Sequence, residues 1–154
     1  MQFKRLGALC GLAVMGAILL SGCHTSSSKS YTFEVSTGDK IKVSLDTSTG
    51  LSLSQKDGTF SVTKDDEKLL DGMLVTKETY DDFAGAKGQQ GMTVLEDSEK
   101  DGNTYYMYEY EGSSGTEDNF IIWIDNSNTG AILASLAGKE KAKDAFEKLV
   151  ITKE

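Results

Sequence analysis

The sequence contains few of the residues that most often carry catalysis or covalent cross-links. Its 154 residues include no proline, two cysteines, one histidine and one arginine. These four residues, Arg5, Cys10, Cys23 and His24, all lie within the first 24 positions. The rest of the chain therefore has no disulfide, no thiol or histidine nucleophile and no Cys–His zinc site. Carboxylates are the remaining route to acid–base chemistry there.

The first 22 residues have the pattern of a signal peptide. Lys4 and Arg5 give a short basic start, and an apolar run of fifteen residues follows over 6–20. This run is shorter than the roughly twenty apolar residues that a membrane-spanning helix needs, and it contains several glycines. The alternative is an uncleaved amino-terminal anchor helix.

Cys23 is the predicted lipidation site. The sequence Leu20-Ser-Gly-Cys23 resembles the bacterial lipobox, in which an aliphatic residue and two small residues precede the lipid-carrying cysteine. We therefore expect an extracytoplasmic protein that is lipid-anchored to the bacterial cell membrane, because two acyl chains anchor firmly. The expected division is a signal peptide over 1–22, a polar tether over 23–30 and a single domain over 31–154.

The expected mature chain is acidic. Without Lys4 and Arg5, 14 of the 16 basic residues remain against 24 acids, a formal charge of −10. An acidic surface without arginine repels phosphate backbones, which argues against nucleic acid as a partner. The expected partners are the membrane, through the lipid on Cys23, and an envelope protein or glycan.

Alternating apolar and polar residues predict strands over most of the domain, and two segments have helical spacing. One helix is expected over 77–87, between Thr76 as N-cap and Gly88, and another closes the chain with an apolar face that includes Phe146 and Val150. Antiparallel runs with two helices indicate the α+β class, an antiparallel sheet flanked by the helices. The expected strands are 31–35, 41–45, 51–53, 60–62, 69–75, 92–94, 104–111, 120–124 and 131–136.

The element order resembles a known family. Strands, a helix around Tyr80–Phe83, a Tyr-rich strand, a strand with Trp123, an Asn-Thr-Gly turn and a closing helix are similar to the PsbP-like fold. That fold is shared by extrinsic photosystem subunits, a Ran-binding nuclear factor and many small bacterial lipoproteins. The resemblance implies an α/β/α sandwich and transfers no site residues.

The tyrosines of 104–111 are the candidate binding residues. Tyr106, Tyr108 and Tyr110 alternate onto one face of the expected strand, where they could form an exposed platform for a protein or a glycan. The alternative is that they cover a sheet edge or lie under a helix.

Acidic segments suggest two further possibilities. Residues 65–67 and Asp81-Asp82 could supply paired carboxylates for a hydrolase or hold a cation. The loops 97–102 and 125–130 resemble half of a calcium-binding loop, but they read better as hairpin turns. We predict no catalytic residue, no metal site and no cofactor. The expected function is a non-enzymatic binding or accessory domain, with an envelope hydrolase or a weak calcium-responsive module as alternatives.

Overall fold

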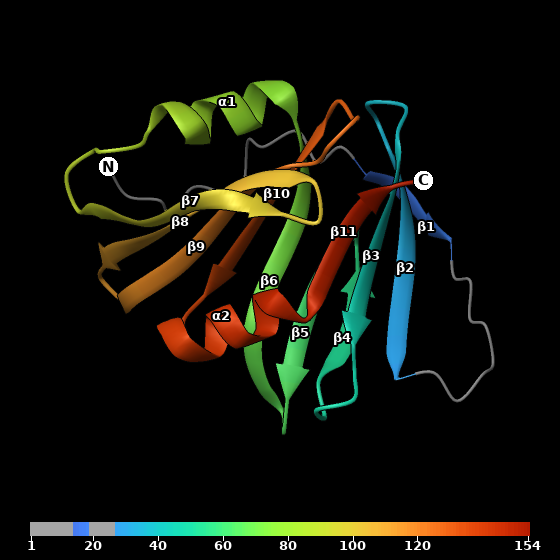
Figure 1. Cartoon of the computed structure of the whole chain (residues 1–154), viewed down its shortest axis with the longest axis horizontal. Helices are drawn as coiled ribbons and strands as arrows, with labels where there is room; N and C mark the ends of the chain where they lie inside the picture. Colours follow the sequence, from blue (N-terminus) through green and yellow to red (C-terminus); the bar gives the residue numbers. More distant parts are fainter. Residues whose placement is uncertain (1–13, 19–26) are drawn as a thin grey trace.

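The computed structural model describes residues 14–18 and 27–154 of the chain (Figure 1). Within them lie eleven strands and two helices. The predicted lipidation site Cys23, and most of the predicted signal peptide, lie outside the described residues. In chain order the elements are β1 (Val14–Ile18), β2 (Ser28–Val35), β3 (Lys40–Asp46), β4 (Ser52–Lys56), β5 (Thr59–Lys64), β6 (Glu67–Thr76), α1 (Lys77–Gly85), β7 (Met92–Lys100), β8 (Asn103–Gly112), β9 (Gly115–Trp123), β10 (Thr129–Ser135), α2 (Lys139–Glu147) and β11 (Leu149–Lys153).

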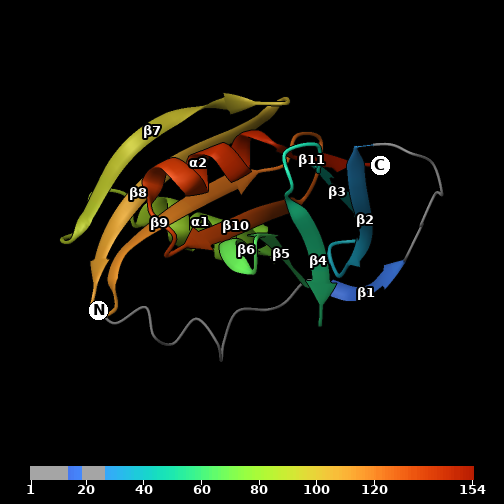
Figure 2. The same cartoon turned by 90° about the horizontal axis from the view of Figure 1, so that it is seen from below.

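The strands form two antiparallel sheets. The large sheet has seven strands in the order β4-β5-β6-β10-β9-β8-β7, and the small sheet has the order β1-β2-β3-β11. Two meanders, β4–β6 and β7–β10, meet where β10 pairs with β6, with Thr129 opposite Thr76. Figure 2 shows the small sheet at one end of the molecule and β7 at the other.

The expected single sheet flanked by two helices is wrong. The described chain is mostly β, and each helix has only nine residues. Part of the sequence forms a second sheet instead, which packs against the β4–β5 end of the large sheet. The α/β/α sandwich that the PsbP-like resemblance implied is therefore not the architecture of this chain.

The closing helix ends earlier than its apolar spacing suggested. Helix α2 ends at Glu147, and Leu149 and Val150 belong to β11, where Leu149 lies opposite Leu45 of β3. The β-branched residues of 150–152 favour a strand. This short strand is what completes the small sheet.

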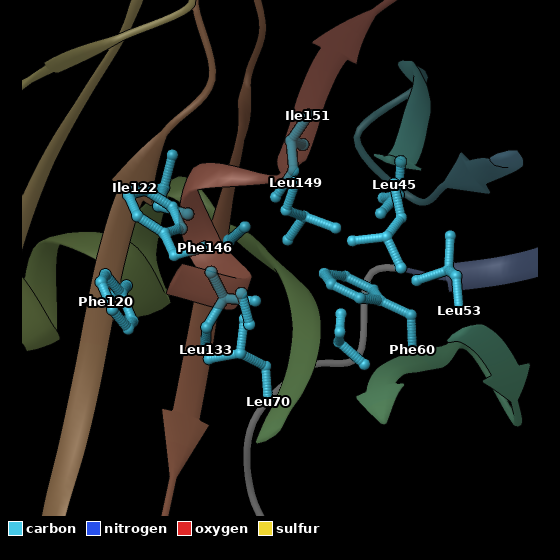
Figure 3. Packing of buried hydrophobic residues seen from close by; sticks show 14 of the residues in the cluster. Leu45, Leu53, Phe60, Leu70, Phe120, Ile122, Leu133, Phe146, Leu149 and Ile151 are labelled. Carbon is cyan, nitrogen blue, oxygen red and sulfur yellow. The ribbon is translucent and has the colours of Figure 1, made fainter. Parts of the chain in front are cut away.

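The main hydrophobic core lies between the two sheets and α2 (Figure 3). Phe33 of the small sheet approaches Phe60 of the large sheet, with 6.0 Å between ring centroids. On the α2 side, Phe146 stacks on Phe120 at 4.4 Å. In Figure 3, Leu149 lies between these two groups, so the core continues from α2 to the small sheet.

Helix α1 covers part of the opposite face of the large sheet. Its N-cap is Thr76, as predicted, whose side chain accepts a hydrogen bond from the Thr79 amide at 3.4 Å. Gly130 allows the helix to lie close to β10, because a Cβ at this position would be 3.1 Å from Tyr80. The helix crosses only one part of this face (Figure 1), and the described residues form a pocket over another part.

Two features bear on the amino-terminal predictions. Residues 14–18, within the predicted signal peptide, form β1 and pair with the edge of β2, with Ile18 opposite Thr32. Strand β2 begins at Ser28, so the last three residues of the expected tether belong to the sheet. Neither of the two described helices is long and apolar enough to cross a membrane.

Candidate functional site

The tyrosines of β8 alternate as predicted, but two of them are not a surface platform. Tyr106 and Tyr108 are each 2% exposed, and Tyr110 is half-buried. The Tyr106 hydroxyl donates a hydrogen bond to the Phe83 carbonyl oxygen at 2.6 Å. Tyr106 therefore lies under α1, as the alternative interpretation has it.

Tyr108 and Tyr110 instead line a pocket of about 650 Å³ on the α1 face of the large sheet. Phe83 of α1 forms one side, and the hairpin between β8 and β9 forms another. We call this space the acid-rimmed pocket. Its apolar lining consists of Met73, Phe83, Tyr108, Tyr110, Ile132, Ala134 and Leu136, and its polar side chains are those of Thr59, Asp71, Glu111, Ser113, Ser114, Glu117 and Asn119.

The pocket follows from strand alternation and from the length of α1. On β9, Ile121 packs in the cluster beneath α1, while Phe120 and Ile122 point into the main core. Glu117 and Asn119 have the same parity as Ile121, so they also face the α1 side. Because α1 ends at Gly85, neither of the two described helices lies over this end of the sheet face.

Two rim carboxylates have partners within the protein. Asp71 accepts a hydrogen bond from the Ser61 hydroxyl at 2.6 Å and forms an ion pair with Lys68 at 2.9 Å. Glu111 accepts a hydrogen bond from the Thr116 hydroxyl at 2.9 Å. Both acids are solvent-exposed.

Glu117 differs from these two acids. It is half-buried, and its carboxylate makes no hydrogen bond or ion pair with the described part of the chain. Its charge acts on the neighbouring Tyr108: burial raises the pKa of the Tyr108 hydroxyl above its usual value, and Glu117 raises it further. Glu117 is therefore an anionic group inside the pocket that is not neutralised by a described residue.

The acidic segments singled out in the sequence lie elsewhere. Asp65 and Asp66 form the exposed turn between β5 and β6, and both have positive φ. Asp81 forms an ion pair with Lys77 on the exposed side of α1. Within residues 14–18 and 27–154, no three metal-ligating side chains come together.

The two segments that resemble half of a calcium-binding loop contain hairpin turns, as predicted. Asp101 and Gly102, with φ of 55° and 87°, form the two-residue connection between β7 and β8. Asp97 lies within β7 and pairs with Lys87. The second segment connects β9 to β10, where the Ser127 hydroxyl donates to the Ile124 carbonyl oxygen.

Asp118 is a buried acid on the opposite face of the sheet. It is 1% exposed, and its Oδ1 atom has no hydrogen-bond partner among the described residues. Burial raises the pKa of the Asp118 carboxyl, and the charge of Glu109 opposite raises it further, while Lys139 opposes the shift. This position lies outside the acid-rimmed pocket.

A second buried acid, Asp39, joins the two sheets. It lies in the turn between β2 and β3, and its Oδ2 accepts hydrogen bonds from the Asn128 amide at 2.7 Å and the Thr129 hydroxyl at 2.9 Å. Its Oδ1 forms an ion pair with Lys153 of β11 at 2.9 Å. Sequence reasoning missed this group, because the three partners lie about 90 or more residues from Asp39 along the chain.

Comparisons with known proteins do not identify a function for this pocket. No protein-family model matches the chain, and no curated protein matches it.

Proposed function

We propose that this chain is an extracytoplasmic lipoprotein, anchored through lipid on Cys23, whose domain binds a small ligand in the acid-rimmed pocket. The observation that carries the proposal is the pocket itself. Its volume of about 650 Å³ is within the range of small-molecule sites, and apolar side chains with a few polar groups are the usual lining of such sites.

Binding fits the pocket better than hydrolysis does. Three carboxylates line the pocket, those of Asp71 of β6, Glu111 of β8 and Glu117 of β9. A carboxylic acid that acts as a general acid is kept protonated by a desolvated setting. Asp71 and Glu111 are exposed and accept hydrogen bonds from neighbouring side chains, Glu117 is only half-buried, and the fully buried acid Asp118 lies on the other face.

The pocket can be tested with the neutral, environment-sensitive dye Nile red. We expect its fluorescence to rise on binding to the wild-type protein. The substitution Ala134→Trp, which places a large ring in the pocket, should abolish most of this rise. Ser54→Trp on the exposed side of β4 is the matched control and should bind the dye like the wild type. Equal dye binding by Ala134→Trp and Ser54→Trp, with both folded by circular dichroism, would contradict a ligand site here.

A further inference from the structure

We infer that the ligand of the acid-rimmed pocket is an amphipathic cation, with an apolar body against the sheet and a protonated amine at Glu117. This inference rests on the proposed function and adds the chemical class of the ligand. Three observations carry it: the sign of the charge around the pocket, the unpaired state of Glu117, and the buried amide beside it.

The charge of the pocket is of one sign. Its seventeen lining residues include three acids and no lysine, arginine or histidine. Lys68 lies next to the rim, but its ammonium group is paired with Asp71. A ligand with a carboxylate or a phosphate would bring a like charge close to Glu111 and Glu117, and like-charge contacts are a common means of rejecting the wrong ligand.

Of the three carboxylates, Glu117 would be stabilised most by a bound cation. A partly desolvated charge without a partner is unfavourable, and an ammonium group within hydrogen-bonding distance would compensate for the lost solvation. Asp71 and Glu111 already accept hydrogen bonds from the protein. The cationic end of the ligand is therefore expected at Glu117 rather than elsewhere on the rim.

Asn119 adds a neutral acceptor next to this charge. The residue is 4% exposed and lines the pocket. Its Nδ2 donates to the Glu117 carbonyl oxygen at 3.4 Å, while its Oδ1 accepts no hydrogen bond from the described residues. An ammonium group has three donors and no acceptor, so it could serve both the Glu117 carboxylate and the Asn119 oxygen.

The apolar lining suits the other end of such a ligand. Met73, Ile132 and Ala134 present aliphatic surface, and Tyr108 and Tyr110 present aromatic rings near the acidic side. Aromatic faces also attract cations. The same domain already contains this kind of contact, since the Lys87 ammonium lies 4.3 Å from the ring centroid of the buried Tyr106.

Three eight-carbon compounds separate charge from apolar character: octylammonium, 1-octanol and octanoate. Each would be titrated against Nile red bound to the wild-type protein at low salt. We expect octylammonium to displace the dye at about a tenfold lower concentration than 1-octanol, which corresponds to one good charge-assisted contact. Octanoate should be the weakest of the three, and added salt should reduce the preference for octylammonium.

The variant Glu117→Gln tests the assigned residue. It should remove most of the tenfold preference for octylammonium and leave the affinity for 1-octanol unchanged. Glu99→Gln on the exposed side of β7 is the matched control and should keep the wild-type preference. Glu117→Lys should shift the preference toward octanoate.

The outcomes distinguish the two proposals. If neither Nile red nor 1-octanol binds the pocket, the proposed function fails. If both bind but the wild-type protein takes octylammonium and 1-octanol equally well, only the cationic ligand class is overturned. The wild-type series alone decides this second point, so it does not depend on the folding of a variant. An unchanged preference in a folded Glu117→Gln variant would overturn the role of Glu117.

Discussion

At the scale of single residues, Asp39 and Asp118 show how two buried carboxylates can have opposite effects on stability. Asp39 accepts hydrogen bonds from the Asn128 amide and the Thr129 hydroxyl and is paired with Lys153, so its charge is compensated. Asp118 has an oxygen without a partner among the described residues and faces Glu109. The first acid should therefore favour the folded state when ionised, and the second should disfavour it.

We predict that Asp39→Asn lowers the free energy of unfolding at pH 7 by about 1–3 kcal/mol, since it removes a charged hydrogen-bonding partner from a buried network. Urea denaturation followed by circular dichroism measures this change. Glu34→Gln, which removes an exposed ion pair with Lys40, is the control and should leave the midpoint nearly unchanged. Similar decreases in the free energy of unfolding for both variants would show that the Asp39 network stabilises the fold no more than an exposed ion pair does.

The effect of Asp39 should depend on pH. Burial alone would raise the pKa of the Asp39 carboxyl, but the hydrogen bonds from Lys153, Asn128 and Thr129 outweigh it, and the pKa is lowered. The stabilisation is therefore fully present above the unfolded-state pKa of about 4 and is lost as pH falls through the folded-state pKa. The difference between wild type and Asp39→Asn should narrow below pH 4, as urea titrations at pH 7 and pH 3 would show.

For Asp118 the sign is reversed. Its folded-state pKa is raised, so the ionised carboxylate destabilises the fold at neutral pH, and this penalty disappears as pH falls through the raised pKa toward the unfolded-state value. Asp118→Asn should therefore raise the melting temperature at pH 7, because the amide is neutral and can donate toward Glu109. The gain should shrink as the pH approaches 4. A lower melting temperature at pH 7 would indicate that the carboxylate has a stabilising partner.

At the scale of elements, the close approach of β5 and β6 depends on a glycine. A Cβ on Gly72 would lie 2.3 Å from the Phe60 ring, which is too close without movement of the core. We predict that Gly72→Ala lowers the free energy of unfolding by about 1–3 kcal/mol, the usual cost of overpacking. Gly85→Ala at the end of α1 is the matched control, since nothing lies within 4 Å of its Cβ, and it should be neutral or stabilising. Thermal unfolding of both variants decides the point.

Most elements could be predicted from the sequence, because they depend on local spacing and turn residues. The β7–β8 turn at Asp101-Gly102 and the Thr76 cap of α1 are examples. The existence of two sheets could not be predicted in this way. Alternation shows that a strand has a buried face, but it does not show which strand lies next to it in the sheet. For example, β11 pairs with β3, which lies about 100 residues earlier in the sequence.

The site was predictable only in part. Tyr108 and Tyr110 were singled out and do line the pocket, although as part of its wall and not as an exposed platform. The signal for Glu117 and Asn119 was available in their parity on β9. Parity alone could not predict a pocket, because the pocket also depends on where α1 ends and where the β8–β9 hairpin lies.

At the scale of the whole molecule, attachment and ligand binding should be separable. We predict that Cys23→Ser in the full-length chain abolishes incorporation of a clickable fatty acid and moves the protein from the detergent phase to the aqueous phase in Triton X-114 partitioning. Nile red binding should persist, because the pocket lies in the folded domain. Ser21→Ala is the control and should still be labelled, since it keeps a small residue before the cysteine. Continued labelling of Cys23→Ser would rule out lipidation at this position.

If the chain is exported as proposed, strand β1 constrains the order in which export and folding take place. Residues 14–18 cannot pair with the edge of β2 and at the same time lie in a membrane as part of a signal peptide. If the small sheet formed first with β1 included, the apolar segment would be held by the folded domain and kept from the secretion machinery. The proposed export would therefore require that residues 14–18 enter the membrane before β2 and β3 fold. Cleavage before Cys23 would then leave the β2 edge around Thr32–Val35 without the strand that covers it in the precursor.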